Sequence, residues 1–225
     1  MGRRHSRLCA QGSWTAFSLK PALSVVVRID PPPPRRQTQA IFHELDIGSR
    51  LLRIYRPEPH GPTATGFRRT GPLLRFDHHR QAVDCGILYA AFTLSCCLVE
   101  CFGDTGVIDA QGRRLGFLLT TRPLQLLELR GRGAMRDGSV AALASTADRD
   151  LSQNWSRYFH ASYPQIDGVI YSSAHNEEAA VALYERAEAD LHCEIDYPLD
   201  HRSLRSRILE VASDHAMEAP PATQR

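Results

Sequence analysis

Residues 86–102 read GILYAAFTLSCCLVECF, in which one short apolar run leads directly into a second. The first run, Gly86 to Ala91, is short and apolar enough to form a buried strand. Thr93 is a suitable N-cap for a helix that continues to Phe102, with Gly103 at the C′ position after it. A helix that is apolar almost all round is buried on most sides, so this stretch predicts the centre of the fold.

Glu100 is the only charged residue of this predicted helix, in which seven of the ten residues from 93 to 102 are apolar. It follows Cys97 and Cys96 by three and four residues, so the three side chains share one helix face. A carboxylate on a buried helix costs several kcal/mol unless it is paired or faces a polar cleft. Glu100 therefore either lies in a functional cleft or occupies the one solvent-facing stripe of the helix.

The rest of the chain alternates between strand-like and helix-like segments. Strands are predicted over residues 51–55, 73–76, 117–120, 124–129 and 168–172. Helices are predicted over residues 139–159 and 201–215. Residues 178–191 contain strong helix formers, although residues 181–184 could equally form a strand. This irregular interleaving predicts an α+β or mixed α/β domain.

The composition is that of an ordinary globular domain. The 225 residues are 43% hydrophobic and 23% charged, which excludes a largely disordered chain. The formal net charge of +2 argues against a uniformly basic nucleic-acid-binding surface. No stretch approaches 18 consecutive apolar residues, so we expect no membrane span.

The six cysteines do not predict a zinc ribbon, because none forms a Cys-x-x-Cys pair. Cys96, Cys97 and Cys101 lie within one apolar run, and we expect them to be small buried hydrophobic residues. Free buried cysteines are typical of a reducing compartment, so we expect a cytoplasmic protein.

Both ends of the chain differ from its body. Residues 1–36 carry a net charge of +6, and residues 31–34 are four prolines, which favour extended polyproline geometry. We therefore predict a disordered leader over residues 1–40, one domain over residues 41–216 and a disordered tail over residues 217–225. The alternative is a leader that binds single-stranded nucleic acid through Arg3, Arg4, Arg7, Arg35, Arg36, Trp14 and Phe17.

Residues 73–79 read LLRFDHH and place Arg75 between apolar residues. Such an arginine is either an edge residue of a strand or a fixed anion clamp, because guanidinium matches phosphate geometry. The adjacent Asp77, His78 and His79 do not converge on one ion from an ordinary strand. We therefore expect a turn or a hydrogen-bonded histidine there, and no metal site.

Residues 166–176 read IDGVIYSSAHN, a buried strand that runs into a polar loop. Ser172, Ser173, His175 and Asn176 supply hydroxyl, imidazole and amide groups within five positions. The carboxyl ends of strands are common places for functional sites, so the loop is either part of a site or a simple polar turn.

These features together resemble the RES domain family, which is named for an Arg, a Glu and a Ser. The resemblance extends over most of residues 50–190. Its pieces, in order, are RIYR at 53–56, RF at 75–76, ILYAA at 87–91, LVE at 98–100, TRPL at 121–124, DGVIYSS at 167–173 and Asn176.

The resemblance implies an α+β fold similar to ADP-ribosyltransferases, with a mixed split β-sheet and surrounding helices. It implies a toxin of a bacterial toxin–antitoxin pair that cleaves the nicotinamide–ribose bond of NAD by phosphorolysis, hydrolysis or ADP-ribosyl transfer to a protein. NAD is then the substrate, with no further cofactor and no metal. The implied partner is a cognate antitoxin, through which alone the toxin would contact nucleic acid. The alternative is a catalytically silent RES-like module that only binds a partner.

Carried over by position, Arg75, Glu100 and Ser173 are the family's Arg, Glu and Ser. Tyr89 matches a family tyrosine eleven residues before that Glu, and Tyr55 is matched to another. The resemblance implies that Arg75 binds the pyrophosphate, with Ser173 orienting it or bonding the substrate. Glu100 would stabilise positive charge on the ribose, while Tyr89 and Tyr55 would help to bind the dinucleotide.

The segment around the predicted arginine departs from the family pattern, which has Gly-Gly before this residue and Trp-Asn after it. Here residues 72–77 read PLLRFD. Arg68 and Arg69 therefore compete with Arg75 for this role, and Ser172 competes with Ser173.

Overall fold

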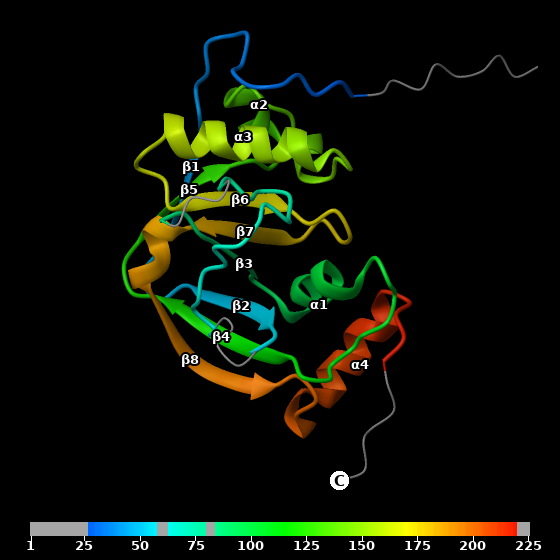
Figure 1. Cartoon of the computed structure of the whole chain (residues 1–225). Helices are drawn as coiled ribbons and strands as arrows, with labels where there is room; N and C mark the ends of the chain where they lie inside the picture. Colours follow the sequence, from blue (N-terminus) through cyan, green and yellow to red (C-terminus); the bar gives the residue numbers. More distant parts are fainter. Residues whose placement is uncertain (1–26, 58–62, 80–83, 220–225) are drawn as a thin grey trace, which may run out of the picture.

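The computed structural model describes residues 27–57, 63–79 and 84–219 (Figure 1). In this part of the chain the strands form one eight-stranded sheet with the order β1-β5-β6-β7-β3-β2-β4-β8. The strands are β1 (Phe42–Leu45), β2 (Arg50–Tyr55), β3 (Ile87–Ala91), β4 (Arg114–Thr120), β5 (Leu124–Glu128), β6 (Gly168–Ser172), β7 (Ala179–Tyr184) and β8 (Leu191–Pro198).

The sheet is mixed, and it is weakly joined at one point. β5 and β6 are parallel, whereas the other neighbouring strands are antiparallel. β2 pairs with β3 only at Leu52 and Ala91, although β2 pairs with β4 along all six of its residues. The sheet thus divides between β3 and β2, which confirms the predicted α+β class with a mixed, split sheet.

Four α-helices accompany the sheet in the described residues: α1 (Leu94–Phe102), α2 (Arg132–Arg136), α3 (Arg149–Ser162) and α4 (Arg205–Asp214). The predicted cap of α1 is confirmed, because Thr93 Oγ1 accepts a hydrogen bond from the Cys96 amide at 3.0 Å. Figure 1 shows α2 and α3 over the β1, β5, β6 and β7 end, and α1 and α4 beside the other end. Among these helices the longest has 14 residues, and none is both long and apolar enough to cross a membrane.

The strands alternate between two hydrophobic clusters. In β3, Ile87 and Ala91 belong to the cluster that contains Leu98 of α1 and Trp155 of α3. Leu88 and Ala90, which lie between them, belong to the other cluster. The sheet curls (Figure 1), and this second cluster gathers apolar side chains from both parts of the sheet, namely Leu51, Leu118, Leu126, Ile170, Val181 and Leu183.

Four predicted elements are wrong or incomplete. Residues 73–76 form a turn rather than a strand, because Asp77 Oδ2 accepts hydrogen bonds from the amides of Leu73 and Leu74. Residues 178–191 form β7 and a 3₁₀ helix, Glu185–Asp190, so the strand alternative holds for the first half. Two further 3₁₀ helices, Ala141–Ala144 and Arg202–Leu204, replace parts of the predicted helices.

The predicted disordered ends are also corrected where the structure describes them. Residues 27–40 pack on the domain, since Trp155 Nε1 donates to Asp30 O at 2.9 Å and the Gln39 amide donates to Arg136 O at 2.7 Å. In the predicted tail, the Glu218 amide donates to Gly106 O at 2.7 Å. Residues 1–26 and 220–225, where the rest of these two predictions falls, lie outside the described residues.

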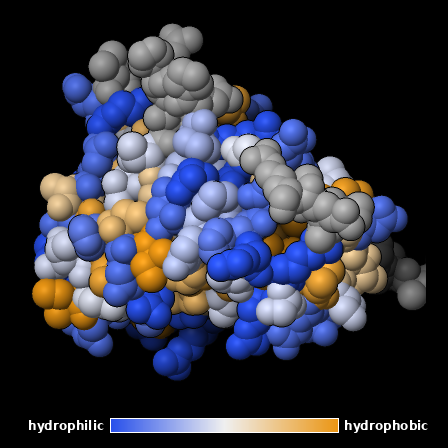
Figure 2. All heavy atoms as spheres, turned by 90° about the horizontal axis from the view of Figure 1, so that it is seen from below, coloured by the Kyte–Doolittle hydropathy of each residue, from blue (hydrophilic) through white to orange (hydrophobic). Residues whose placement is uncertain are grey.

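Figure 2 shows the molecule from below the view of Figure 1. Hydrophilic residues cover most of the coloured surface, and hydrophobic residues lie among them in small groups. This mixture is typical of a surface exposed to water.

Candidate functional site

A cavity of about 350 Å³ opens on the helix-bearing face, where β2 and β3 separate. Its size is typical of a small-molecule site. Its walls come from β2, β3, α1, the turn at Leu74 and Arg75, the start of α3 and the loop after β6. Segments from most of the chain therefore meet at the one place where the sheet is weakly joined.

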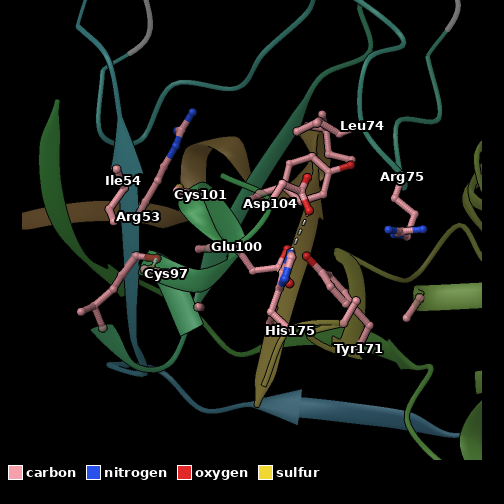
Figure 3. A pocket seen from close by; sticks show the side chains of 18 of the residues that line it. Arg53, Ile54, Leu74, Arg75, Cys97, Glu100, Cys101, Asp104, Tyr171 and His175 are labelled. Atoms are coloured by element: carbon pink, nitrogen blue, oxygen red, sulfur yellow. Dashed lines mark hydrogen bonds and ion pairs between the residues drawn. The ribbon is translucent and has the colours of Figure 1, made fainter. Parts of the chain in front are cut away.

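Glu100 lies in the last turn of α1 and lines this cavity. Figure 3 shows its side chain pointing toward His175 and Tyr171. Tyr171 is buried, and its pKa is raised well above its usual value first by burial and then by the charge of Glu100. Glu100 is exposed, so the solvent-facing stripe of α1 and the wall of the cavity are the same surface. The helix thereby tolerates a carboxylate, since the charge faces the cavity and not the core.

Arg75 lines the same cavity from the turn before β3 and is half-buried. Its Nη1 donates to the carbonyl oxygen of Thr146. Within the described residues no carboxylate forms an ion pair with it. Arg149, in the first turn of α3, also lines the cavity and donates to Leu73 O at 3.3 Å. Two guanidinium groups with hydrogen-bonding capacity left over therefore face one cavity, which suits a phosphorylated ligand.

Arg68, the first competitor of Arg75, also lines the cavity, but its charge is already compensated. Its Nη2 lies 2.7 and 2.8 Å from the two carboxylate oxygens of Asp77, which is fully buried. Burial would raise the pKa of Asp77, but hydrogen bonds from Arg68 and from the amides of Leu73 and Leu74 outweigh burial and lower it. The second competitor, Arg69, forms an ion pair with Glu188 and does not line the cavity.

Tyr89 presents its ring to the cavity while its hydroxyl is held from behind. The hydroxyl donates to Asp77 Oδ1 at 3.0 Å and accepts the amide of Phe76 at 2.9 Å. Burial raises the pKa of Tyr89 well above its usual value, so the phenol stays neutral. The position of the ring and that of the Arg75 turn are thus fixed by the same buried carboxylate.

The other two predicted residues do not line the cavity. Ser173 is buried, and its Oγ accepts the amide of His175 at 3.2 Å, so it shapes the loop that brings Ala174 and His175 to the cavity wall. Ser172, its competitor, is also outside the lining. Tyr55 packs in the opposite cluster, and its hydroxyl donates to Asp196 Oδ2 at 2.7 Å. The structure therefore brings together Arg75, Tyr89 and Glu100, and it leaves Ser173 and Tyr55 outside the lining.

The cavity wall also contains Arg53, Arg149 and Tyr171, which the sequence pattern did not single out, and His175, for which it indicated no specific role. Arg53 is buried in β2, and its Nη1 donates to Ala64 O at 3.0 Å and Gly66 O at 2.7 Å. Burial lowers its pKa to about 10. A charged residue inside the apolar strand RLLRIY was the signal that could have identified it.

The predicted burial of the cysteines is correct at Cys96 and Cys97 but wrong at Cys101. Cys101 is exposed and lines the cavity beside Glu100 in the last turn of α1. In the described part of the chain all five cysteines are free.

The chain resembles proteins that are already known. The family model of the RES domain matches residues 50–205, a range that contains every residue of the cavity wall. A probable toxin of Sinorhizobium fredii, y4kH, is 29% identical over 113 residues, which cover 50% of this chain and 87% of that protein. A chain of the M. tuberculosis MbcT–MbcA toxin–antitoxin complex matches with a TM-score of 0.50 at 16% identity and covers 72% of this chain and 92% of its own length. At that identity, the likeness shows a shared fold.

Proposed function

The chain belongs to the RES domain family, and from this premise we propose that it is a toxin-like enzyme that cleaves the nicotinamide–ribose bond of NAD in the cytoplasm. One observation carries the proposal: Glu100, Tyr89 and Arg75, which the family resemblance singles out, line one cavity. The similarity to a probable toxin and to a chain of a toxin–antitoxin complex supports the toxin-like part.

The chemistry fits the residue types in the cavity. When the bond between the nicotinamide nitrogen and ribose C1′ breaks, its electron pair leaves with neutral nicotinamide and positive charge builds on the ribose. A carboxylate at the position of Glu100 stabilises that charge. Arg75 and Arg149 are placed to bind the pyrophosphate, and Tyr89 offers a fixed ring face for stacking.

Three acceptors of the ADP-ribosyl group are compatible with this chemistry. Phosphate would give phosphorolysis, water would give hydrolysis, and a side chain of a target protein would give ADP-ribosylation. We propose NAD as the substrate with no additional cofactor. We also propose a cognate antitoxin as the partner, through which the protein would contact nucleic acid.

The decisive experiment follows free nicotinamide after NAD is mixed with the purified chain, with and without phosphate. We expect Glu100→Gln to lower the rate by at least about 100-fold, as is typical when one preorganised charge-stabilising group is removed. Glu44→Gln is the matched control, because Glu44 is an exposed carboxylate on β1. A folded Glu100→Gln variant with the control's rate would remove Glu100 from the mechanism.

A second candidate is a catalytically silent RES-like module that only binds a partner. The position of Ser173 favours it, since this predicted site residue is buried behind the cavity wall and its Oγ is engaged with the amide of His175. Absence of nicotinamide release at every phosphate concentration and pH tested would support the module and exclude the enzyme.

A further inference from the structure

A second group of ionisable side chains lies outside the cavity wall, where His78, His160 and Glu185 meet. His78 Nε2 lies 2.9 Å from Glu185 Oε2, and His160 Nε2 lies 2.8 Å from Glu185 Oε1. The two imidazole rings stack with their centroids 4.3 Å apart. The proposed NAD reaction uses none of these three residues.

The three side chains present donor atoms in an arrangement that a metal ion can use. One nitrogen from each histidine and one oxygen of Glu185 all lie within 4.8 Å of one another. An ion at the usual zinc distances of about 2.0–2.2 Å would replace the hydrogen bonds between the imidazoles and Glu185, with small shifts of the three side chains. Two imidazoles and one carboxylate form a ligand set that zinc commonly accepts, with one position left for water.

The orientation of the side chains also suits coordination. His78 Nε2 and His160 Nε2 face different oxygens of Glu185, so both imidazoles present a nitrogen to the same carboxylate. The Nδ1 atom of His78 has no hydrogen-bond partner within the described residues, so a proton can move to it without breaking an existing bond.

The group is enclosed on one side and open on the other. The side chain of His78 is 2% exposed, whereas those of His160 and Glu185 are 20% and 18% exposed. An ion can therefore enter from the side of His160. The three residues come from separate segments: the turn that carries Arg75, helix α3, and the first residue after β7.

We propose that His78, His160 and Glu185 form a binding site for a divalent transition-metal ion of the zinc class. The bound ion cross-links α3 and the end of β7 to the segment that follows Arg75. The three ligands do not line the cavity, so the ion would support the cavity wall without taking part in the proposed NAD reaction.

The test uses the full chain without a histidine tag, stripped of metal with a chelator. Co²⁺ is the probe, because its visible absorption reports nitrogen and oxygen coordination in a protein site, and Zn²⁺ is then added as competitor. We expect one Co²⁺ per chain, a visible absorption band, loss of that band on addition of Zn²⁺, and a higher melting temperature with Zn²⁺.

Two ligand variants and one control variant test whether these residues bind the ion. His160→Gln and Glu185→Gln should each lower the affinity for Co²⁺ by at least tenfold and abolish the thermal shift. His192→Ala, an exposed histidine on β8, should bind like the unmodified chain. Circular dichroism confirms that each variant is folded, and Glu185→Gln keeps the shape of the side chain with one acceptor oxygen and one donor nitrogen facing the two histidines. A missing Co²⁺ band in the unmodified chain, or a band of equal affinity in both glutamine variants, would overturn the proposal and leave a hydrogen-bonded His–Glu–His group.

Discussion

Arg68 and Arg75 lie seven positions apart and have the same charge in different surroundings. Arg68 forms a two-point contact with a fully buried carboxylate, so its guanidinium holds the turn together. Arg75 donates to a backbone carbonyl and keeps further N–H groups for a ligand. Substitution of Arg68 should therefore lower the stability of the fold, whereas substitution of Arg75 should weaken substrate binding.

Substituting each arginine by alanine tests this difference. We expect Arg75→Ala to raise the KM for NAD by at least about tenfold, because a charge-assisted hydrogen bond contributes about 1.5–3 kcal/mol, with little change in the free energy of unfolding. Arg68→Ala leaves Asp77 buried without its cation and should lower that free energy by about 3 kcal/mol. Urea unfolding and steady-state kinetics of both variants measure the two effects. Equal destabilisation by both substitutions would contradict the assignment.

Asp137, at the end of α2, makes stability depend on pH. It is fully buried; its Oδ1 accepts the amide of Ser139 at 2.9 Å, and its Oδ2 has no hydrogen-bond partner in the described residues. Burial raises its pKa to about 7, and the hydrogen bond from Ser139 opposes that rise only in part. The folded state therefore binds a proton that the unfolded chain releases at lower pH. The stability that this proton contributes is complete below the unfolded pKa and is lost as the pH rises through about 7.

Asp137→Asn should remove this dependence, because asparagine stays neutral and can still accept the amide of Ser139. Relative to the unmodified chain, the variant should gain free energy of unfolding as the pH rises from about 5 to about 8. Urea denaturation across that interval measures the difference. Asp46→Asn, at an exposed position, should leave the slope unchanged. A difference that is constant with pH would show that Asp137 is already ionised in the folded state.

At the scale of elements, the pairing of β6 with β7 leaves no room for a side chain at Gly168. A Cβ atom there would lie 2.3 Å from the carbonyl oxygen of Ala182 and 2.8 Å from the Cα atom of Leu183. Both are backbone atoms of β7, and a paired strand cannot yield as the end of a flexible side chain can. We therefore expect Gly168→Ala to lower the free energy of unfolding by at least about 2 kcal/mol.

Gly48→Ala provides the contrast. Its Cβ would meet nothing within 4 Å, but Gly48 has a φ of +79°, a conformation that alanine adopts only with strain. That substitution should cost about 1 kcal/mol, from the backbone alone. Thermal and urea unfolding of both variants compare a steric with a conformational penalty. If Gly168→Ala were the milder substitution, the close approach of β6 and β7 would be wrong.

The elements that the sequence predicted well are those decided by nearby residues. The strand before Phe92, the cap at Thr93 and the helix after it follow from local pattern and capping chemistry. β8 was not among the predicted strands. Its apolar residues 191, 193, 195 and 197 alternate as in a strand, but the segment is a strand in the structure because it pairs with β4. The turn at residues 73–76 was mistaken for a strand, because the acceptor that stabilises it, Asp77, acts through its side chain.

The same distinction applies to the candidate site. Glu100 and Tyr89 could be predicted because β3 and α1 follow one another directly, so a charge on an apolar helix is conspicuous. Arg149 could not be predicted, since it reaches the cavity only because α3 packs over the turn that carries Arg75. Ser173 was identified by family resemblance, but its side chain is turned into the loop by the tertiary fold.

At the scale of the whole molecule, the proline-rich segment at residues 27–40 closes the end of the domain formed by α2 and α3. Trp155 is 1% exposed, and its indole N–H donates to Asp30 O. Gly138 has a φ of +94° and no Cβ, and the Cβ of Pro34 lies 2.3 Å from where such an atom would be. The segment thus fills space on the domain, although its composition alone suggested disorder.

Two deletions measure what this segment contributes. Removal of residues 1–26 retains every contact described above, whereas removal of residues 1–40 exposes Trp155 and takes away the acceptor of its N–H group. We expect the longer deletion to have a lower free energy of unfolding than the shorter one by about 2 kcal/mol or more, the amount that full burial of one large apolar side chain contributes. Urea unfolding followed by tryptophan fluorescence detects both the loss of stability and the exposure of the indole. Because neither Trp155 nor residues 27–40 line the cavity, nicotinamide release by the folded fraction should be equal in the two proteins. Equal unfolding free energies would mean that the segment rests on the domain without stabilising it.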